Sequence, residues 1–460
     1  MNLEQEFQTD PFTQYFIDII REDPEYAQEC TQEISDYIAS SSAGNGDKHH
    51  SIHTMPIPKF YSIEMAEDFQ QIVAITYQIF AKVIDAYMTD ANVRKIFGFS
   101  KEMEDLILLD RGYKCPLPIA RFDIFYHEDT GDFKFCEINT DGTSAMNENR
   151  ELINSLTYNG LFMDFAADLA SQNIAVHHFE YFQSWANEFI NIYSEFTNAV
   201  DHPYIAIVDF LENAYMEDFI EFQKVFIREG YECEICDIRK LTYENGALIS
   251  PSGHKIDAIY RRAVTSDIMK HLDEVQPLIT AYKEQAVCLI GSFATQIIHN
   301  KQLFIALRNE TLQNYLTAPE VAFIEAHVPY TNAMTMENVD ADHVIETKNK
   351  WILKPLDSYA ASGIYLGYDY KQKEWVDIIS KCCENGHYLY QEYYVPYQSP
   401  NIDCMGGDED FSLFYNMNGL YVYHGHLAGI YTRVCKNRLI AGQFGGKELP
   451  SVVVDTISQE

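Results

Sequence analysis

The chain has 460 residues, which is enough for about three domains. Lys and Arg number 33 against 69 Asp and Glu, and the net charge of −36 argues against a protein that binds nucleic acid or an anionic membrane. The chain contains no run of about 20 apolar residues, so we expect no transmembrane helix. Its N-terminus is polar and acidic, unlike a secretory signal, and its cysteines are scattered, so we expect a cytoplasmic protein.

The first third of the chain has the periodicity of helices. Apolar residues in the stretch 69–88 recur at the spacing of one helix face, and we expect a helical N-terminal region over residues 1–115. Two strands should follow, IARFDIFYHE and DFKFCEINT, joined by the turn signal Asp129-Thr130-Gly131.

Residues 201–290 alternate between strand and helix patterns. YIAIVDF reads as a buried strand, and a helix follows that ends near Gly230. The strands YECEICDI and IDAIYRR come next, so we expect a small parallel β-α-β sheet.

The last part of the chain mixes helices and strands. FATQIIHNKQLFIALRN predicts a helix that carries Lys301. WILKPLDSYAASGIYLG predicts a strand, a small-residue loop and a strand, and YLYQEYYVP predicts another strand. FSLFYNMNGLYVYHGHLAGIYTR predicts an antiparallel hairpin that turns at Asn418-Gly419.

The first candidate site is the hairpin in 119–140. Arg121 and Asp123 alternate on one strand and Glu137 and Asn139 on the other, so the four side chains can share a face, about 5 Å apart across the strands. Carboxylate and amide oxygens suit Mg²⁺, and an arginine there can neutralise a transferring phosphoryl group. An ordinary sheet face with Arg–carboxylate pairs explains the pattern equally well.

The other candidates involve lysines and a strand end. Lys354 ends an apolar strand, and the small residues that follow it, Ser362 and Gly363 among them, could bring backbone N–H groups to a phosphate. Neither a Walker A loop nor a Rossmann G-x-G-x-x-G is present. Gln391 and Glu392 end an aromatic strand able to contact an adenine edge. Each of these candidates has a simpler explanation. Lys354 could lie at the edge of an ordinary hairpin, Lys301 could be a surface lysine, and the strand with Gln391 and Glu392 could be part of the core.

In chain order, these motifs resemble the glutathionylspermidine synthetase family of ATP-grasp ligases, in its synthetase part only. The matching residues are Arg121-Phe-Asp123, Glu137-Ile-Asn139, Asp141 to Ser144, Asn300-Lys301, Lys354-Pro355, Gln391-Glu392 and Arg433. The metal candidates precede the lysines, as in the circularly permuted order of that family. The resemblance covers roughly residues 115–450, so no match to the family's amidase domain is expected.

The resemblance implies an α/β (α+β) fold of the ATP-grasp type with circularly permuted order, a small parallel β-α-β domain and a helical N-terminal region. Residues 1–115 would form the helical region, 116–200 the first part of the ATP-grasp domain with its metal hairpin, 201–290 the β-α-β domain, and 291–460 the remainder with the nucleotide-binding lysines.

The resemblance also implies ATP and Mg²⁺ as cofactors and an ADP-forming ligase that joins a small-molecule carboxylate to an amine through an acyl phosphate. Asp123, Glu137 and Asn139 would hold the metal, and Arg121 and Arg433 would be catalytic. The nucleotide would be bound by Lys301, Lys354, Ser362, Gly363, Gln391 and Glu392, and the substrate by Ser144. Apart from the resemblance, Arg261 and Arg262 end the strand IDAIYRR and could hold a substrate carboxylate, although solvation of one of them at the surface explains it at least as well. Gly142 stands where the family has serine, so the two substrates stay open.

Two other functions are compatible with the sequence. A hydrolase acting on carbohydrate could use Asp123 and Glu137 as acid and base, and the 14% aromatic content would suit sugar stacking, but Lys301 and Lys354 would then have no role. A non-catalytic nucleotide-binding protein could retain the fold. The sequence does not indicate an oligomeric state.

Overall fold

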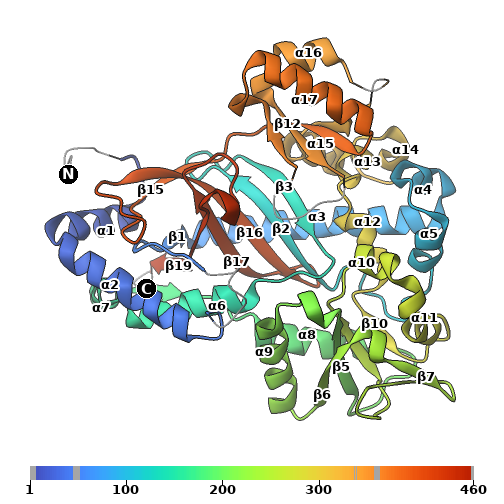
Figure 1. Ribbon diagram of the computed structural model, residues 1–460. Coiled ribbons are helices and arrows are strands. Elements are labelled where there is room, and N and C mark those ends of the chain that lie inside the picture. Colours follow the sequence, from blue (N-terminus) through green and yellow to red (C-terminus); the bar gives the residue numbers. More distant parts are fainter. Residues whose placement is uncertain (1–6, 45–51, 336, 338, 357–362, 457–460) are drawn as a thin grey trace.

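The computed structural model describes residues 7–44, 52–335, 337, 339–356 and 363–456. Figure 1 shows a central antiparallel sheet with a lobe above it, a lobe below it and a group of helices at one end. The central sheet has the order β18-β17-β16-β2-β3, with β15 paired to β16. Its strands are β2 (Ile119–Tyr126), β3 (Phe133–Asn139), β15 (Gln398–Asn401), β16 (Ser412–Tyr423), β17 (His426–Cys435) and β18 (Lys447–Leu449).

The hairpin predicted for 119–140 is confirmed. Arg121 on β2 lies opposite Asn139 on β3, and Asp123 lies opposite Glu137, with an irregularity in the ladder directly after Asp123. The four polar side chains of the first candidate site therefore meet at neighbouring positions of one strand pair.

The turn predicted at Asn418-Gly419 is wrong. β16 runs through both residues, and the chain reverses at His424-Gly425, which both have positive φ. Asn418 is buried and donates to the Tyr61 hydroxyl (2.7 Å), so tertiary contacts override its turn preference. A side chain at Gly419 would come within 2.9 Å of Arg121 and Asp123, so this glycine makes room for their pairing.

The long helix α3 (Ile63–Thr89) packs across the central sheet. Its Phe80 ring meets Phe122 of β2 edge-on at 5.5 Å, and Phe69 and Val83 are fully buried in the same core. Of the described helices, α3 is the one with the length and apolar content of a membrane span, and 50% of that apolar window is buried inside the protein.

The N-terminal region contains a strand among its helices. β1 (Lys59–Ser62) pairs in parallel with β19 (Ser451–Thr456), which also pairs with β4 (Ile174–His177). The expectation of a purely helical region over 1–115 missed this strand because its partner lies almost 400 residues away. The helices nearby are α1 (Pro11–Glu22), α2 (Pro24–Ser40), α6 (Met146–Ser155) and α7 (Gly160–Ser171). The helices α4 (Ala91–Phe97) and α5 (Lys101–Ile107) lie at the other end of α3.

The lower lobe is the parallel β-α-β sheet predicted for 201–290, and we call it the parallel-sheet lobe. Its strand order is β10-β9-β5-β6, and every pairing in it is parallel. The elements are α8 (Phe182–Ser194), β5 (Tyr204–Asp209), α9 (Met216–Arg228), β6 (Glu232–Asp237), β9 (Ala258–Arg261), α10 (Thr265–Lys270), α11 (Gln276–Lys283) and β10 (Cys288–Ile290), with the small hairpin β7 (Thr242–Glu244) and β8 (Ala247–Ile249).

The upper lobe, which we call the small-sheet lobe, is an antiparallel sheet covered by helices. Its strand order is β11-β14-β12-β13. The elements are α14 (Glu310–Gln313), α15 (Ala318–His327), β11 (Thr331–Ala333), α16 (Ala341–Glu346), β12 (Trp351–Pro355), β13 (Tyr365–Leu366), α17 (Gln372–Asn385) and β14 (Tyr388–Glu392). The strands predicted around Lys354 and Gln391 are therefore confirmed.

The helix predicted for 293–309 is interrupted. α12 (Gln296–His299) and α13 (Leu303–Ala306) are separated by a turn that carries Lys301. Asn300 has an extended backbone, and its side chain accepts a hydrogen bond from the Gln302 N–H (2.8 Å), which competes with the helix. The break places Lys301 in a turn rather than on a helix face.

Candidate functional site

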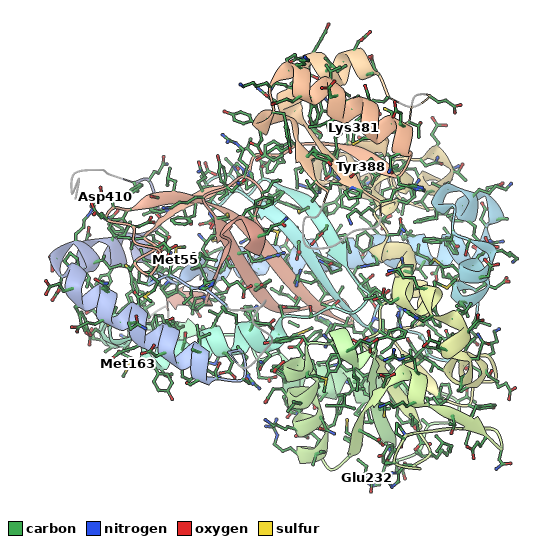
Figure 2. All side chains as sticks on the ribbon, viewed as in Figure 1. Met55, Met163, Glu232, Lys381, Tyr388 and Asp410 are labelled. Atoms are coloured by element: carbon green, nitrogen blue, oxygen red, sulfur yellow. The ribbon has the colours of Figure 1, made fainter. Side chains whose placement is uncertain are left out.

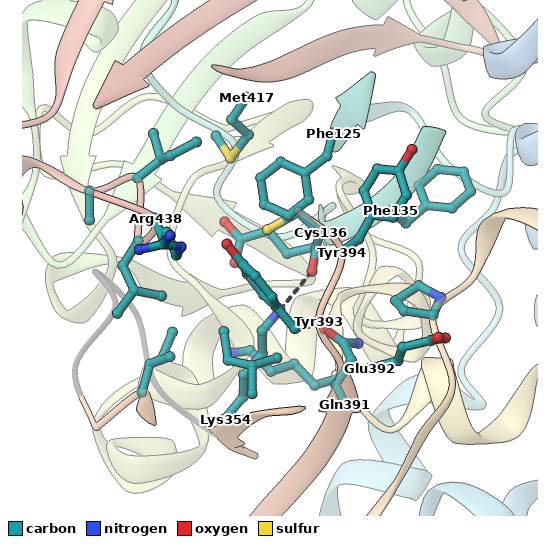
Figure 3. A pocket seen from close by; sticks show the side chains of 18 of the residues that line it. Phe125, Phe135, Cys136, Lys354, Gln391, Glu392, Tyr393, Tyr394, Met417 and Arg438 are labelled. Atoms are coloured by element: carbon teal, nitrogen blue, oxygen red, sulfur yellow. Dashed lines mark hydrogen bonds between the residues drawn. The ribbon is translucent and has the colours of Figure 1, made fainter. Parts of the chain in front are cut away.

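A cavity of about 140 Å³ lies between the central sheet and the small-sheet lobe (Figure 3). The central sheet contributes Phe125, Phe135, Cys136, Glu137, Met417 and Arg433 to its wall. The small-sheet lobe and its connections contribute Pro329, Ile352, Lys354, Ile364, Gln391, Glu392, Tyr393 and Tyr394, and Lys301 and the stretch 438–441 complete it. Six residues named from the sequence therefore meet here: Glu137, Lys301, Lys354, Gln391, Glu392 and Arg433.

The cavity has an apolar part and a charged part. Phe125, Phe135 and Met417 face Ile352 and the tyrosines that follow β14, a lining suited to a flat ring. The charged side chains lie on the walls of the same space. This combination of an apolar slot with convergent cations is the usual character of a site for an anionic ligand with an aromatic part.

Asp123 is the most enclosed of the charged side chains. It has no exposed surface, and Arg121 binds both of its oxygens, at 2.7 and 2.9 Å. Arg433 (3.3 Å) and the Asn139 amide (3.2 Å) also donate to Asp123. Burial raises the pKa of Asp123, while the two arginines act in the opposite direction. Its carboxyl group thus joins both predicted catalytic arginines.

Glu137 is the carboxylate of the hairpin that faces the cavity. Burial would raise its pKa, but the positive charges of Lys301, Arg433, Arg121 and Lys354 outweigh burial and lower the pKa to about 2. Glu137 is therefore ionised at neutral pH. Lys354 is itself buried and donates to the Cys136 carbonyl (3.1 Å), which fixes its position beside Glu137.

The oxygen atoms of the hairpin suit a divalent cation in kind. Asp123 and Glu137 offer carboxylates, and a flip of the Asn139 amide would present its oxygen on the same side. The Asp123 oxygens are already bound by arginines, so Glu137 is the more accessible ligand. Over the described ranges there is no group of three or more His, Cys, Asp or Glu that could hold a metal.

The remaining predicted site residues lie outside this cavity. The Ser144 carbonyl accepts from the Tyr421 hydroxyl (2.8 Å) and from Arg121 (3.4 Å), so it adjoins the hairpin. Gly363 has φ +72° and precedes the cavity residue Ile364. Ser362, which we predicted to bind the nucleotide, lies outside the described residues.

The assignment of Arg261 to a substrate needs correction. Arg261 is almost fully buried and forms an ion pair with Asp141 (2.6 Å). Its other donors point to the carbonyls of Ala263, Gly291 and Ser292. With its donors used in this way, Arg261 holds the end of β9 in place and does not project towards the cavity.

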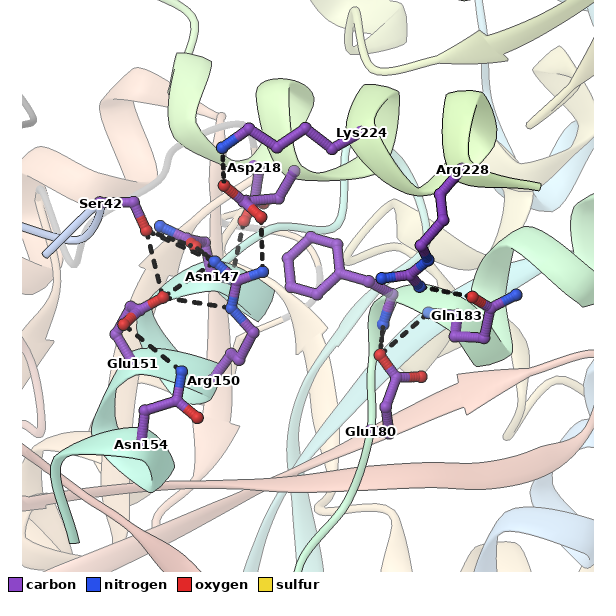
Figure 4. A network of polar contacts seen from close by, with 12 residues as sticks. Ser42, Asn147, Arg150, Glu151, Asn154, Glu180, Gln183, Asp218, Lys224 and Arg228 are labelled. Carbon is purple, nitrogen blue, oxygen red and sulfur yellow. Dashed lines mark hydrogen bonds and ion pairs between the residues drawn. The ribbon is translucent and has the colours of Figure 1, made fainter. Parts of the chain in front are cut away.

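A second polar region lies where α6, α9 and the ends of β5 and β9 meet, and we call it the polar junction. Figure 4 shows its side on α6 and α9, with Asn147 and Asp218. Arg262 pairs with the fully buried Asp218 (3.2 Å), and Asp218 accepts from the Asn147 backbone N–H (2.8 Å). The Arg262 Nε and the Glu148 Oε2 are buried without a recorded hydrogen bond among the described residues. Burial, with Asp218 and Glu448 nearby, raises the pKa of Glu148 well above its usual value.

The polar junction also receives the N-terminal region. The Tyr37 hydroxyl donates to Glu151 (2.6 Å), and Ser42 donates to Asn147 (3.0 Å) and Glu151 (3.2 Å). Sequence reasoning missed Asn147, Glu148 and Glu151. Their signal was the polar run NENRE at residues 147–151, which can be recognised only once the partner elements are known.

Comparison with solved structures shows the fold class. A glutathione synthetase-like effector from Globodera pallida aligns with a TM-score of 0.57 at 12% identity over 93% of this chain and 97% of that one. A candidate gamma-glutamylcysteine synthetase from Methylobacillus flagellatus aligns with a TM-score of 0.42 at 12% identity, covering 86% of this chain and 89% of that one. No protein-family model and no curated protein matches the sequence. The protein therefore has a mixed α/β fold similar to that of the glutathione synthetase-like effector.

Proposed function

We propose that the protein is an ATP-dependent carboxylate–amine ligase of the ATP-grasp type, with the circularly permuted order and the domain boundaries given above. One observation carries the proposal: Glu137, Lys301, Lys354 and Arg433 converge on a single cavity between two antiparallel sheets. The four come from segments up to about 300 residues apart in the sequence. The resemblance implies that these same four residues belong to one nucleotide and metal site, and their convergence supports that.

The cavity divides naturally between the parts of ATP. The apolar walls and the end of β14, with Gln391 and Glu392, would hold the adenine, and Lys301 and Lys354 would bind the phosphates. In a chain with a net charge of −36, such a local group of cations is what allows an anionic ligand to bind. These cations also lower the pKa of Glu137, so its carboxylate stays ionised beside the proposed phosphate position.

Glu137, Asn139 and Asp123 would hold Mg²⁺, which when bound neutralises phosphate charge. Arg121 and Arg433 already face this corner and would stabilise the phosphoryl group during its transfer to a carboxylate. Closure of the two sheets around the cavity would exclude water from the acyl phosphate that forms, which would otherwise hydrolyse.

The two small-molecule substrates would bind towards the polar junction. β6 lies on one side of β5 and β9 on the other, so the strand order changes direction at β5, and ligands of open α/β sheets bind at such a point beyond the carboxyl ends of the strands. Arg262 follows β9 directly, and its charge acts on Glu148 in the first turn of α6. Ser144 precedes that helix by two residues. An amine that attacks the acyl phosphate would approach from this side.

Nucleotide binding and ADP release test the proposal together. Mg-ATP should raise the melting temperature, and a screen of carboxylate and amine pairs should release ADP. Asp123→Asn combined with Glu137→Gln should abolish that release. Glu232→Gln is a suitable control, because Figure 2 shows Glu232 on the outer end of the parallel-sheet lobe. ADP release that persists in the double variant would refute the metal assignment.

The alternatives give different results in the same assays. A carbohydrate hydrolase should show no thermal shift with Mg-ATP and should cleave a glycoside. A non-catalytic binding protein should shift with ATP but release no ADP with any pair of substrates. The arginine pairing of Asp123 disfavours the hydrolase, because a carboxylate bound at both oxygens is a poor proton donor.

A further inference from the structure

A short surface stretch closes one side of the cavity, and the proposed function gives it no role. The chain leaves β17 at Cys435, turns, and lines the cavity with Arg438, Leu439, Ile440 and Ala441. The turn is fixed by two backbone donors: Asn437 N–H donates to the Cys435 sulfur (3.3 Å), and Leu439 N–H donates to the Asn437 side chain (3.0 Å). Lys436 anchors it through an ion pair with Asp408 (2.6 Å).

Arg438 joins the two walls of the cavity from this turn. Its guanidinium carbon lies 3.8 Å from the ring centre of Tyr368, which belongs to the small-sheet lobe. It also lies 5.7 Å from the ring centre of Tyr415 on β16 of the central sheet. Tyr368 remains half exposed, at 48%, with the arginine stacked on it. Stacking of this kind holds a guanidinium flat while its N–H edges stay able to donate.

The charge of Arg438 stands apart from that of its neighbour Arg433. Arg433 is paired with Asp123, whereas no hydrogen bond or ion pair joins Arg438 to any residue that the structure describes. Figure 3 shows Arg438 across the cavity from Gln391 and Glu392, with the Tyr393 ring between them. Its guanidinium therefore lies at the cavity wall on the side away from the proposed adenine position.

We propose that Arg438 binds the phosphate chain of the nucleotide from this wall and that Tyr368 orients it for that contact. The inference rests on the proposed nucleotide site and adds a residue to it that none of the sequence motifs includes. A phosphate oxygen has the charge and the geometry that a guanidinium edge binds best. The contact links the turn after β17 to the small-sheet lobe through the bound nucleotide.

Isothermal titration calorimetry with ATP, ADP and adenosine tests the inference. Arg438→Ala should weaken ATP and ADP binding by roughly ten-fold to one-hundred-fold, as the loss of one charge-assisted contact predicts, and should leave adenosine binding unchanged. Arg21→Ala is the matched control, because Arg21 also stacks on a ring, 5.6 Å from the Phe411 centre, but does not line the cavity. Arg438→Gln replaces the alanine variant if its melting temperature falls.

The possible results separate the two proposals. Equal ATP affinity in Arg438→Ala and wild type would overturn the role of Arg438 and leave the nucleotide site intact. A loss that is the same for adenosine as for ATP would also overturn it, because the residue would then act on the base. A wild-type protein that binds none of the three ligands would refute the nucleotide site itself.

Discussion

The charged side chains of the cavity line an open space, whereas the polar junction contains charged side chains that are buried and paired with one another. In the cavity, Glu137, Lys301 and Lys354 face a shared space and influence one another across it. At the junction, Arg262 and Asp218 are buried and bound to each other. Charged side chains that face a space can bind a ligand, whereas buried ion pairs mainly hold helices and strands in position. The comparison predicts that variants at the junction lose stability and variants in the cavity lose binding.

The largest effect on stability should come from Arg262→Met. This change leaves Asp218 buried without its charged partner, and breaking a buried pair on one side costs about 3–5 kcal/mol. Chemical denaturation of the wild type and the variant measures the loss. Adding Asp218→Asn should recover much of it, because no buried charge then remains unpaired and the amide oxygen can still accept from the Asn147 N–H. If Arg262→Met were as stable as the wild type, the conclusion that the buried pairs of the junction stabilise the fold would be wrong.

Lys354→Met should have the opposite profile. Loss of its ammonium group should weaken ATP binding by roughly ten-fold to one-hundred-fold, as expected for one charge-assisted contact. Its apolar stem is retained, so the free energy of unfolding should fall by only about 1–3 kcal/mol, the cost of the lost hydrogen bond to the Cys136 carbonyl, which is less than for Arg262→Met. Calorimetric titration and denaturation of the same sample provide both values. Lys381→Met on the outer surface of α17 is the control (Figure 2), and a binding loss of equal size there would remove the argument for Lys354.

The sequence predicted the cavity better than the junction, for a physical reason. The hairpin with Arg121, Asp123, Glu137 and Asn139 follows from strand alternation and a local turn, so its face could be predicted without a tertiary model. Lys301 and Lys354 could be assigned to the same site because the order of the motifs resembles that of a known family. Asn147 and Asp218 could not be paired in advance, because their contact joins a helix start to a distant helix through a backbone N–H. Arg261 was misassigned for the same reason: its partner Asp141 lies 120 residues away.

Asp209 extends the comparison to a carboxyl group at the junction that forms no ion pair with any residue in the described part of the chain, although the charges of Arg262 and Arg261 act on it. It ends β5, and burial raises its pKa from 3.8 to about 6. Because its folded-state pKa is raised, the group stabilises the fold in acid, and that contribution is lost as the pH rises through about 6. Asp209→Asn should therefore raise the melting temperature above pH 7 and should bring no gain near pH 4. A gain that is independent of pH would show that burial of the charge is not the cause.

The smallest effect should come from Tyr37→Phe, which tests whether the N-terminal region matters to the site. The change removes one hydrogen bond to Glu151, worth about 1 kcal/mol, and keeps the ring stacked on Tyr158 at 4.4 Å. α6 would then be held less firmly where its first turn faces the proposed substrate side. We expect KM for the carboxylate or the amine to rise by a few-fold, with KM for ATP unchanged. If KM for ATP changed instead, α6 would support the cavity. The conclusion that the cavity and the polar junction act separately would then be wrong.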